Sequence, residues 1–253
     1  MQLKRLLPLL PDVQAVVMLV GINDLMLRLS KDRNYDPGFL LSEGAEEKLL
    51  ARAFEVLPLN EVRGQGAWQK TALWRFASRI KDSWFESNKV QDEAGDAIVR
   101  WRGHRRSAPE YRDRLPDLSS ALLEYERNIK ELIRICRESK SEPIFMTQPS
   151  IWREGFPEDQ EWILWMGGIG DYLEQPGSVY YSIGMLGEAM EKYNTVLLAT
   201  CESEGVDCLD LASTLPKDLD TFYDDVHFNK SGAQRVRDAL GAYLLERPPF
   251  GAR

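Results

Sequence analysis

Residues 15–20 form an uninterrupted apolar run, Ala-Val-Val-Met-Leu-Val, which ends at Gly21. A short run of this kind, rich in β-branched residues, is typical of a strand buried on both faces. Such strands belong to parallel sheets, because helices then cover both sides. Residues 144–147 and 206–211 are predicted to be two further strands of the same sheet.

Amphipathic helices are predicted between and after these strands. Apolar residues recur every three or four positions in residues 118–136 and 186–197, which places them on one helical face. The second of these helices is expected to stop near Gly205. A last helix is expected from about Ser231, which forms a capping-box pattern with Gln234. The alternation of strand and helix predicts an α/β fold with right-handed crossovers.

Residues from about 30 to 115 break this alternation. They contain helical pieces near residues 49–54 and 73–84, and four of the seven tryptophans. We therefore predict a helical insertion between the first strand and its helix, within a single domain that spans residues 1–253.

The composition excludes several classes of function. The net charge of −8 argues against binding to nucleic acid or to anionic membrane surfaces. The basic segment at residues 100–106 is predicted to be a solvated loop with His104 at the surface. No apolar run is long enough to span a bilayer, and the N-terminus is too short and proline-broken to predict a signal peptide. The compartment stays open.

The cysteines and histidines predict no metal or disulfide site. Three widely spaced cysteines (Cys136, Cys201 and Cys208) fit neither a disulfide framework nor a metal-binding spacing. We expect them to be buried, reduced thiols. The chain has only two histidines, more than a hundred positions apart, which is a poor basis for a metal site.

Polar residues with catalytic potential follow the first strand. Gly21 allows a sharp turn, and Asn23 comes two residues after it. Ligands of open parallel sheets bind beyond the carboxyl ends of the strands. The Asn23 amide could therefore donate a hydrogen bond to a developing oxyanion. The alternative is an ordinary Asn/Asp turn.

The second candidate is the pair formed by Asp224 and His227, just before the last helix. Histidine is the commonest general base at neutral pH, and it needs a carboxylate to fix its tautomer and orientation. An Asp-x-x-His turn supplies both groups from one short segment. A merely structural or solvated histidine is the alternative.

Together these motifs resemble the SGNH (GDSL-type) hydrolases over residues 5–29 and 116–246. The resemblance implies a flavodoxin-like three-layer α/β/α sandwich that hydrolyses esters through an acyl-serine, without metal or cofactor. It implies that Asn23 donates to the oxyanion, His227 is the general base and Asp224 orients it. Gln148, after the middle strand, supports the resemblance and is expected to bind substrate.

The sequence departs from the family at its nucleophile. It contains no Gly-Asp-Ser, and only about fourteen residues precede the first strand. In a serine protease, loss of the serine alone lowers turnover about 10⁶-fold, so the chain is expected to be inactive alone. Neither Ser150 nor Ser213 lies in a sequence typical of a nucleophile elbow. We expect an N-terminally truncated version of a longer enzyme, with residues 16–20 as an exposed, apolar sheet edge.

The substrate is expected to be a small-molecule, carbohydrate or lipid ester, with Trp152 as a wall of its site. Two other functions fit the sequence. The chain could be a non-catalytic binding module on a decayed hydrolase fold. It could also be an interaction protein that recruits a partner, or a second copy, through the exposed first strand.

Overall fold

The computed structural model describes residues 3, 6–10, 12–37 and 95–247. The chain divides into two compact units, residues 1–37 with 101–253, and residues 38–100. The insertion expected at about 30–115 overlaps the second unit, and its predicted helical pieces lie outside the described residues. The first unit contains the central sheet and the helices that cover it.

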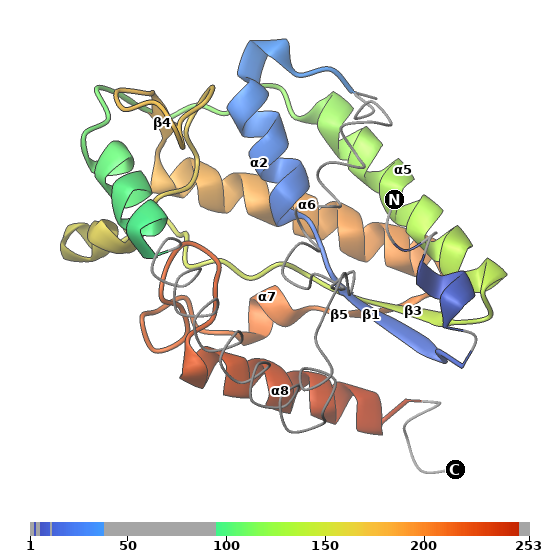
Figure 1. The fold of residues 1–253 in the computed structure, drawn as a ribbon. Helices are drawn as coiled ribbons and strands as arrows, with labels where there is room; N and C mark the ends of the chain where they lie inside the picture. The colour runs from blue at the N-terminus through green and yellow to red at the C-terminus, as the bar shows by residue number, and fades with distance from the viewer. Residues whose placement is uncertain (1–2, 4–5, 11, 38–94, 248–253) are drawn as a thin grey trace, which may run out of the picture. The chain divides into compact units, whose positions relative to one another are not determined.

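The centre of this unit is a parallel sheet with the strand order β1-β3-β5 (Figure 1). Its strands are β1 (Ala15–Leu19), β3 (Glu142–Met146) and β5 (Asp207–Leu209), which confirms the three predicted strands. Pro143 lies opposite Val16, whereas β5 joins the sheet only opposite Ile144. Pro143, which has no N–H to donate, therefore lies where β3 has a neighbouring strand on one side only. A sheet tolerates a proline at such a position.

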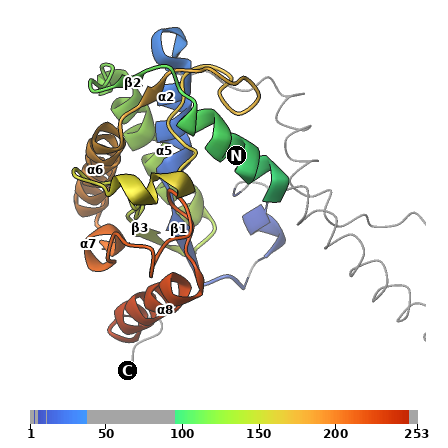
Figure 2. The ribbon, with the colours of Figure 1, turned by 90° about the vertical axis from the view of Figure 1, so that its left-hand side faces the viewer.

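Helices lie on both faces of the sheet, as Figures 1 and 2 show. One face carries α2 (Ile22–Lys31), α5 (Ser119–Glu138) and α6 (Ile183–Glu204), and the other carries α7 (Leu211–Thr214) and α8 (Lys230–Leu245). The unit is thus a mixed α/β structure. Helix α2 follows β1 directly, so the insertion expected at about residues 30–115 begins at the end of α2 and lies before α5.

Smaller elements connect these layers. They are the 3₁₀ helices η1 (Leu7–Leu9), η2 (Asp32–Asn34) and η4 (Glu158–Ile163), and a two-stranded parallel pair of β2 (Tyr111–Arg112) with β4 (Tyr180–Tyr181). Residues 101–106 are helical.

Two helix ends show how local sequence signals operate here. Gly205 ends α6 in the left-handed conformation, with φ of 62°, as its position in the sequence predicts. The capping box predicted for the last helix is wrong. Asn229 caps α8 instead, and its side chain accepts a hydrogen bond of 2.9 Å from the Gly232 amide.

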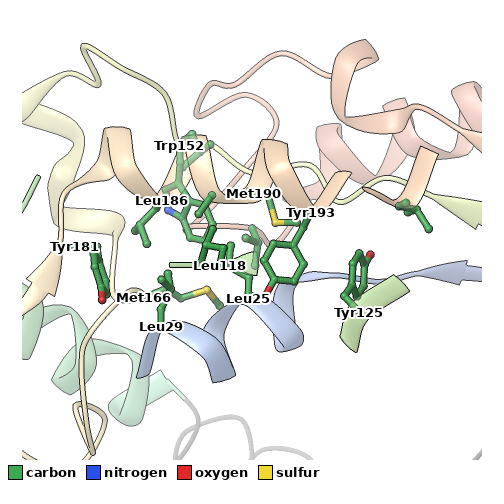
Figure 3. Close-up of a cluster of buried hydrophobic side chains, with 14 of the residues drawn as sticks. Leu25, Leu29, Leu118, Tyr125, Trp152, Met166, Tyr181, Leu186, Met190 and Tyr193 are labelled. Atoms are coloured by element: carbon green, nitrogen blue, oxygen red, sulfur yellow. The ribbon is translucent and has the colours of Figure 1, made fainter. Parts of the chain in front are cut away.

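Apolar side chains fill the space on both sides of the sheet. The main cluster joins the inner faces of α2, α5 and α6, and Figure 3 shows Leu25, Leu186 and Tyr193 within it. A smaller cluster on the other face joins Met146 to Leu211 and partly buried residues of α8. Burial of this apolar surface on both faces stabilises the layered arrangement.

Strand β1 lies at one end of the described sheet. Among the described residues it pairs only with β3. The side chains of Val17 and Leu19 are 39% and 37% exposed, whereas Val16 and Met18 pack against apolar neighbours. Of the residues expected at an exposed, apolar edge, Val17 and Leu19 are therefore exposed, whereas the others are partly buried.

The three cysteines are free, and two of them are buried as the sequence predicted. Cys136 and Cys201 are buried in α5 and α6, and Cys208 is partly buried in β5.

Candidate functional site

The segments that follow the three strands leave the sheet at the same edge, because all three strands are parallel. Asn23 follows β1, Gln148 follows β3, and a long loop between α7 and α8 follows β5. The topology therefore brings the predicted site segments to one edge.

The loop after α7 closes into a tight hairpin. The Tyr223 amide donates to the carbonyl of His227 at 3.1 Å, and the Asn229 amide donates to the carbonyl of Thr221 at 3.0 Å. A Cβ on Gly232, in the first turn of α8, would lie 2.0 Å from the Thr221 carbonyl oxygen. A glycine is therefore required there for the helix to approach the hairpin this closely.

Asp224 and His227 form a hydrogen-bonded pair within this hairpin. The Nδ1 atom of His227 lies 2.8 Å from Oδ2 and 3.0 Å from Oδ1 of Asp224. Oδ1 also accepts from the amides of Val226 at 3.0 Å and His227 at 2.9 Å, and Oδ2 accepts from the Trp165 indole at 3.1 Å. With Nδ1 held by the carboxylate, Nε2 is the nitrogen that can exchange a proton with a reactant.

The surroundings of the pair shift both pKa values. Burial acts to raise the pKa of Asp224, but hydrogen bonds from His227 and Val226 outweigh it and lower this pKa. The hydrogen bond that His227 donates to Asp224 raises the pKa of His227, and burial only partly opposes this. The Asp224 side chain is fully buried, whereas that of His227 is 51% exposed. The imidazole is therefore oriented by a buried carboxylate and is itself accessible to solvent.

The neighbouring Asp225 anchors the hairpin to the segment after β3. Its carboxylate is fully buried and accepts from the Trp152 indole at 2.9 Å and from the amides of Trp165 and Met166 at 2.8 and 3.3 Å. Its carbonyl accepts from the Ile151 amide at 3.0 Å. Burial raises the pKa of Asp225, and nearby Arg105 and the N–H donors oppose this rise. No local sequence signal marks Asp225 as such an anchor.

The basic segment at residues 100–106 is not the solvated loop that the sequence predicted. The Arg105 guanidinium is buried and donates to the carbonyls of Met166 at 2.6 Å and Tyr181 at 3.2 Å. His104, predicted to be at the surface, is also buried. Arginine side chains from this helix therefore fix backbone segments, which composition alone cannot reveal.

Gly21 and Asn23 lie at the start of α2. Gly21 is the N-cap with φ of 123°, and a Cβ there would lie 3.1 Å from both the Met190 methyl and the Tyr125 hydroxyl. The glycine is thus required by its conformation and its close neighbours. Asn23 is exposed in the first helical turn, and among the described residues no hydrogen bond joins it to the Asp224–His227 pair. Its oxyanion role stays a prediction.

The two predicted substrate-binding residues are buried. Trp152 is 0% exposed and lies among core side chains (Figure 3), so in this structure it forms no wall of an open site. Its indole N–H is used by Asp225. Gln148 is buried as well, and its backbone N–H and C=O bind the side chain of Asn194 at 2.8 and 3.0 Å.

Two other tryptophans lie closer to the surface, and one of them contacts the pair. Trp165 is partly buried, donates to Asp224, and packs its ring 4.9 Å from that of Trp101. Trp162 is 52% exposed. The clustering of tryptophans after the middle strand was the only sequence signal for them, and it did not distinguish Trp152 from Trp165.

Neither candidate serine is placed as a nucleophile. Ser150 is buried, and the Ser213 hydroxyl donates to the Asp210 carbonyl at 3.0 Å. Among the described residues, no serine hydroxyl makes a hydrogen bond to His227. The same residues contain no group of three or more His, Cys, Asp or Glu that could hold a metal ion. None of the helices in the described ranges is both long and apolar enough to cross a membrane.

Comparison with known proteins assigns no family. No family model, no curated protein and no solved structure matches this chain.

Proposed function

We propose that this chain carries the general-base half of an SGNH (GDSL-type) ester hydrolase with a flavodoxin-like sandwich. The observation that carries the proposal is the Asp224–His227 pair, in which a buried carboxylate holds one ring nitrogen of a half-exposed imidazole. In the complete reaction, Nε2 removes the proton from a serine hydroxyl as it attacks the ester carbonyl. It then returns this proton to the leaving alcohol.

The other roles follow from the same mechanism. Asp224 stabilises the imidazolium that forms during attack, and Asn23 donates to the oxyanion. The sequence contains no Gly-Asp-Ser, and we assign the nucleophile to none of the described serines. We therefore expect this chain alone to hydrolyse esters only slowly, with His227 activating water directly. The ester is proposed to be a small molecule, carbohydrate or lipid. The exposed Trp162 supports this proposal, because its ring packs against Arg102, which donates to the Tyr223 carbonyl of the hairpin.

The test is the slow hydrolysis of p-nitrophenyl acetate by the purified chain, with the chain unfolded in urea as the background. General-base catalysis contributes roughly 10²–10⁴-fold, so His227→Gln is expected to lower the excess rate at least about tenfold. Asp224→Asn should lower it too. His104→Gln is the matched control, since His104 is the other histidine of the chain. Equal rates in all variants would contradict the proposed base.

A fluorophosphonate probe tests the nucleophile separately. We expect no labelling of this chain, because the probe requires an activated serine. Labelling that depends on His227, located by mass spectrometry, would show that a serine of this chain is the nucleophile and would overturn the expectation that water is activated directly.

A second function is favoured by the exposed side chains of Val17 and Leu19. We propose that β1 associates with a partner chain or with a second copy by adding a strand to the sheet. Sedimentation of the full chain should show concentration-dependent association, which Val17→Lys weakens, because edge lysines oppose strand pairing. A wild-type chain that stays monomeric at all concentrations would exclude self-association.

A further inference from the structure

A pocket of about 400 Å³ lies at the end of α2 that is distant from Asn23. Four arginines and two aspartates line it, together with an apolar wall of Leu115, Pro116 and the ring of Tyr181. Arg28 and Asp32 follow the proposed oxyanion donor, Asn23, by five and nine residues, which is about 7–14 Å along the helix axis. The hydrolase proposal assigns it no role.

Arg28 gives the pocket a fixed positive charge. Its side chain is buried, with 7% exposure, and its donors bind neutral carbonyl oxygens. Nε and Nη2 donate to the Asp117 carbonyl at 3.2 and 2.7 Å, and Nη1 donates to the Asp32 carbonyl at 2.7 Å. Among the described residues no carboxylate lies within ion-pair distance of Arg28. All three of its nitrogens thus donate to neutral carbonyls, and within the described part of the chain no ion pair neutralises its charge.

Asp32 neutralises one other arginine. Its Oδ2 lies 3.0 Å from Nη1 of Arg112, and its Oδ1 accepts from the Tyr181 hydroxyl at 3.3 Å. The backbone of Asp32 has φ of 45°, a conformation that non-glycine residues rarely adopt. Such strain persists only where the surroundings hold it, and here three side chains from separate elements bind this residue.

The two remaining arginines, Arg33 and Arg114, are exposed. Within the described ranges, neither has a carboxylate at ion-pair distance. The second aspartate, Asp117, already accepts from the amide and hydroxyl of Ser119 at 2.9 and 2.7 Å. The pocket therefore presents more positive than negative charge, in a chain whose net charge is −8. Guanidinium groups match the geometry of carboxylate and phosphate oxygens.

We infer that this pocket binds a small organic anion with a carboxylate or phosphate group. The anionic group is held by Arg33 and Arg114 in the positive field of Arg28, and its apolar part lies on the wall of Leu115 and Pro116. The volume is within the usual range for small-molecule sites. This inference does not depend on the hydrolase proposal.

The test is calorimetric titration of the full chain at constant ionic strength with inorganic phosphate, phenyl phosphate and benzoate. We expect phenyl phosphate or benzoate to bind saturably at one site, and phenyl phosphate to bind at least about tenfold more tightly than inorganic phosphate. The double variant Arg33→Gln with Arg114→Gln should weaken this binding about tenfold or more, because each charge-assisted hydrogen bond is worth about that factor.

A matched control is Arg106→Gln with Arg237→Gln, which removes the same charge from exposed positions outside the pocket. This control should change the affinity by less than about twofold. An equal loss in both double variants would mean that the anion responds only to net charge, and would overturn the inference. Failure of both aromatic anions to saturate would overturn it as well. Inorganic phosphate binding as tightly as phenyl phosphate would refute the role of the apolar wall.

Discussion

Replacing Asp225 by alanine tests how the hairpin that carries His227 is held. The fully buried carboxylate accepts from the Trp152 indole and from the amides of Trp165 and Met166. Among the described residues, no other side chain accepts a hydrogen bond from these three N–H groups. Asp225→Ala therefore leaves two well-bonded donors, and a third at 3.3 Å, without acceptors.

The magnitude follows from these contacts. A buried donor that loses its acceptor costs about 1–3 kcal/mol, so the two shorter bonds account for about 2–6 kcal/mol. Removing the carboxylate also relieves the cost of burying it, and we expect a net loss of about 3 kcal/mol in the free energy of unfolding. A chain of this size loses about 2–4 °C of Tm per kcal/mol, which gives a decrease of about 6–12 °C. Asp225→Asn should lose about half as much, because its amide oxygen still accepts from Trp165 and Met166.

Thermal unfolding followed by circular dichroism measures these changes, with Asp220→Ala as control. Asp220 is an exposed aspartate in the same loop, and its replacement should shift Tm by less than about 2 °C. If Asp225→Ala were as stable as Asp220→Ala, the reasoning from unsatisfied donors would be refuted. An Asn variant less stable than the Ala variant would refute it equally.

Two further predictions concern the titration of the pair and the start of α8. In NMR spectra, the ring signal of His227 should titrate above its ordinary pKa of 6.5, and Asp224→Asn should lower that midpoint, because the carboxylate favours the charged ring. The raised pKa adds to the free energy of unfolding. This contribution is fully present below pH 6.5 and is lost as the pH rises through the pKa of His227 in the folded chain. An unchanged titration midpoint in Asp224→Asn would contradict the pairing. Gly232→Ala should destabilise the fold by about 1–3 kcal/mol in denaturant unfolding, because its Cβ meets the Thr221 carbonyl at 2.0 Å. Gly241→Ala, with open space in the same helix, should instead stabilise by about 0.5–1 kcal/mol, and equal effects of the two changes would refute the steric argument.

The regular elements of the first unit could be predicted from the sequence because their signals are local. The apolar run at residues 15–20 predicted β1, and the three-to-four spacing from residue 118 predicted α5. Gly205 ends α6 where expected, since a glycine tolerates the left-handed conformation at a helix C-terminus. The Asp224–His227 contact could be predicted for the same reason, because both residues lie in one turn.

The burial and the partners of individual side chains were decided only by the tertiary structure. Trp152, expected at a substrate wall, is in the core, and His104, expected at the surface, is buried. Asp224 holds the imidazole, whereas the adjacent Asp225 binds a segment about sixty residues away. The two aspartates are the same residue type at neighbouring positions, so their identity alone does not tell these roles apart. Such contacts depend on how distant parts of the chain pack, and local periodicity carries no information about them.

The arginine pocket illustrates the same division. Its lining comes from the end of α2, the residues before α5, and Tyr181. None of these segments carries a local sequence signal for an anion site. Only the packing of α2 against α5 brings these charges together, and their mutual distances decide whether they attract an anion or neutralise one another. The sequence therefore determined the strands, the helices and the local acid–base pair. The tertiary structure determined which charges are buried, which remain open to solvent, and where they meet.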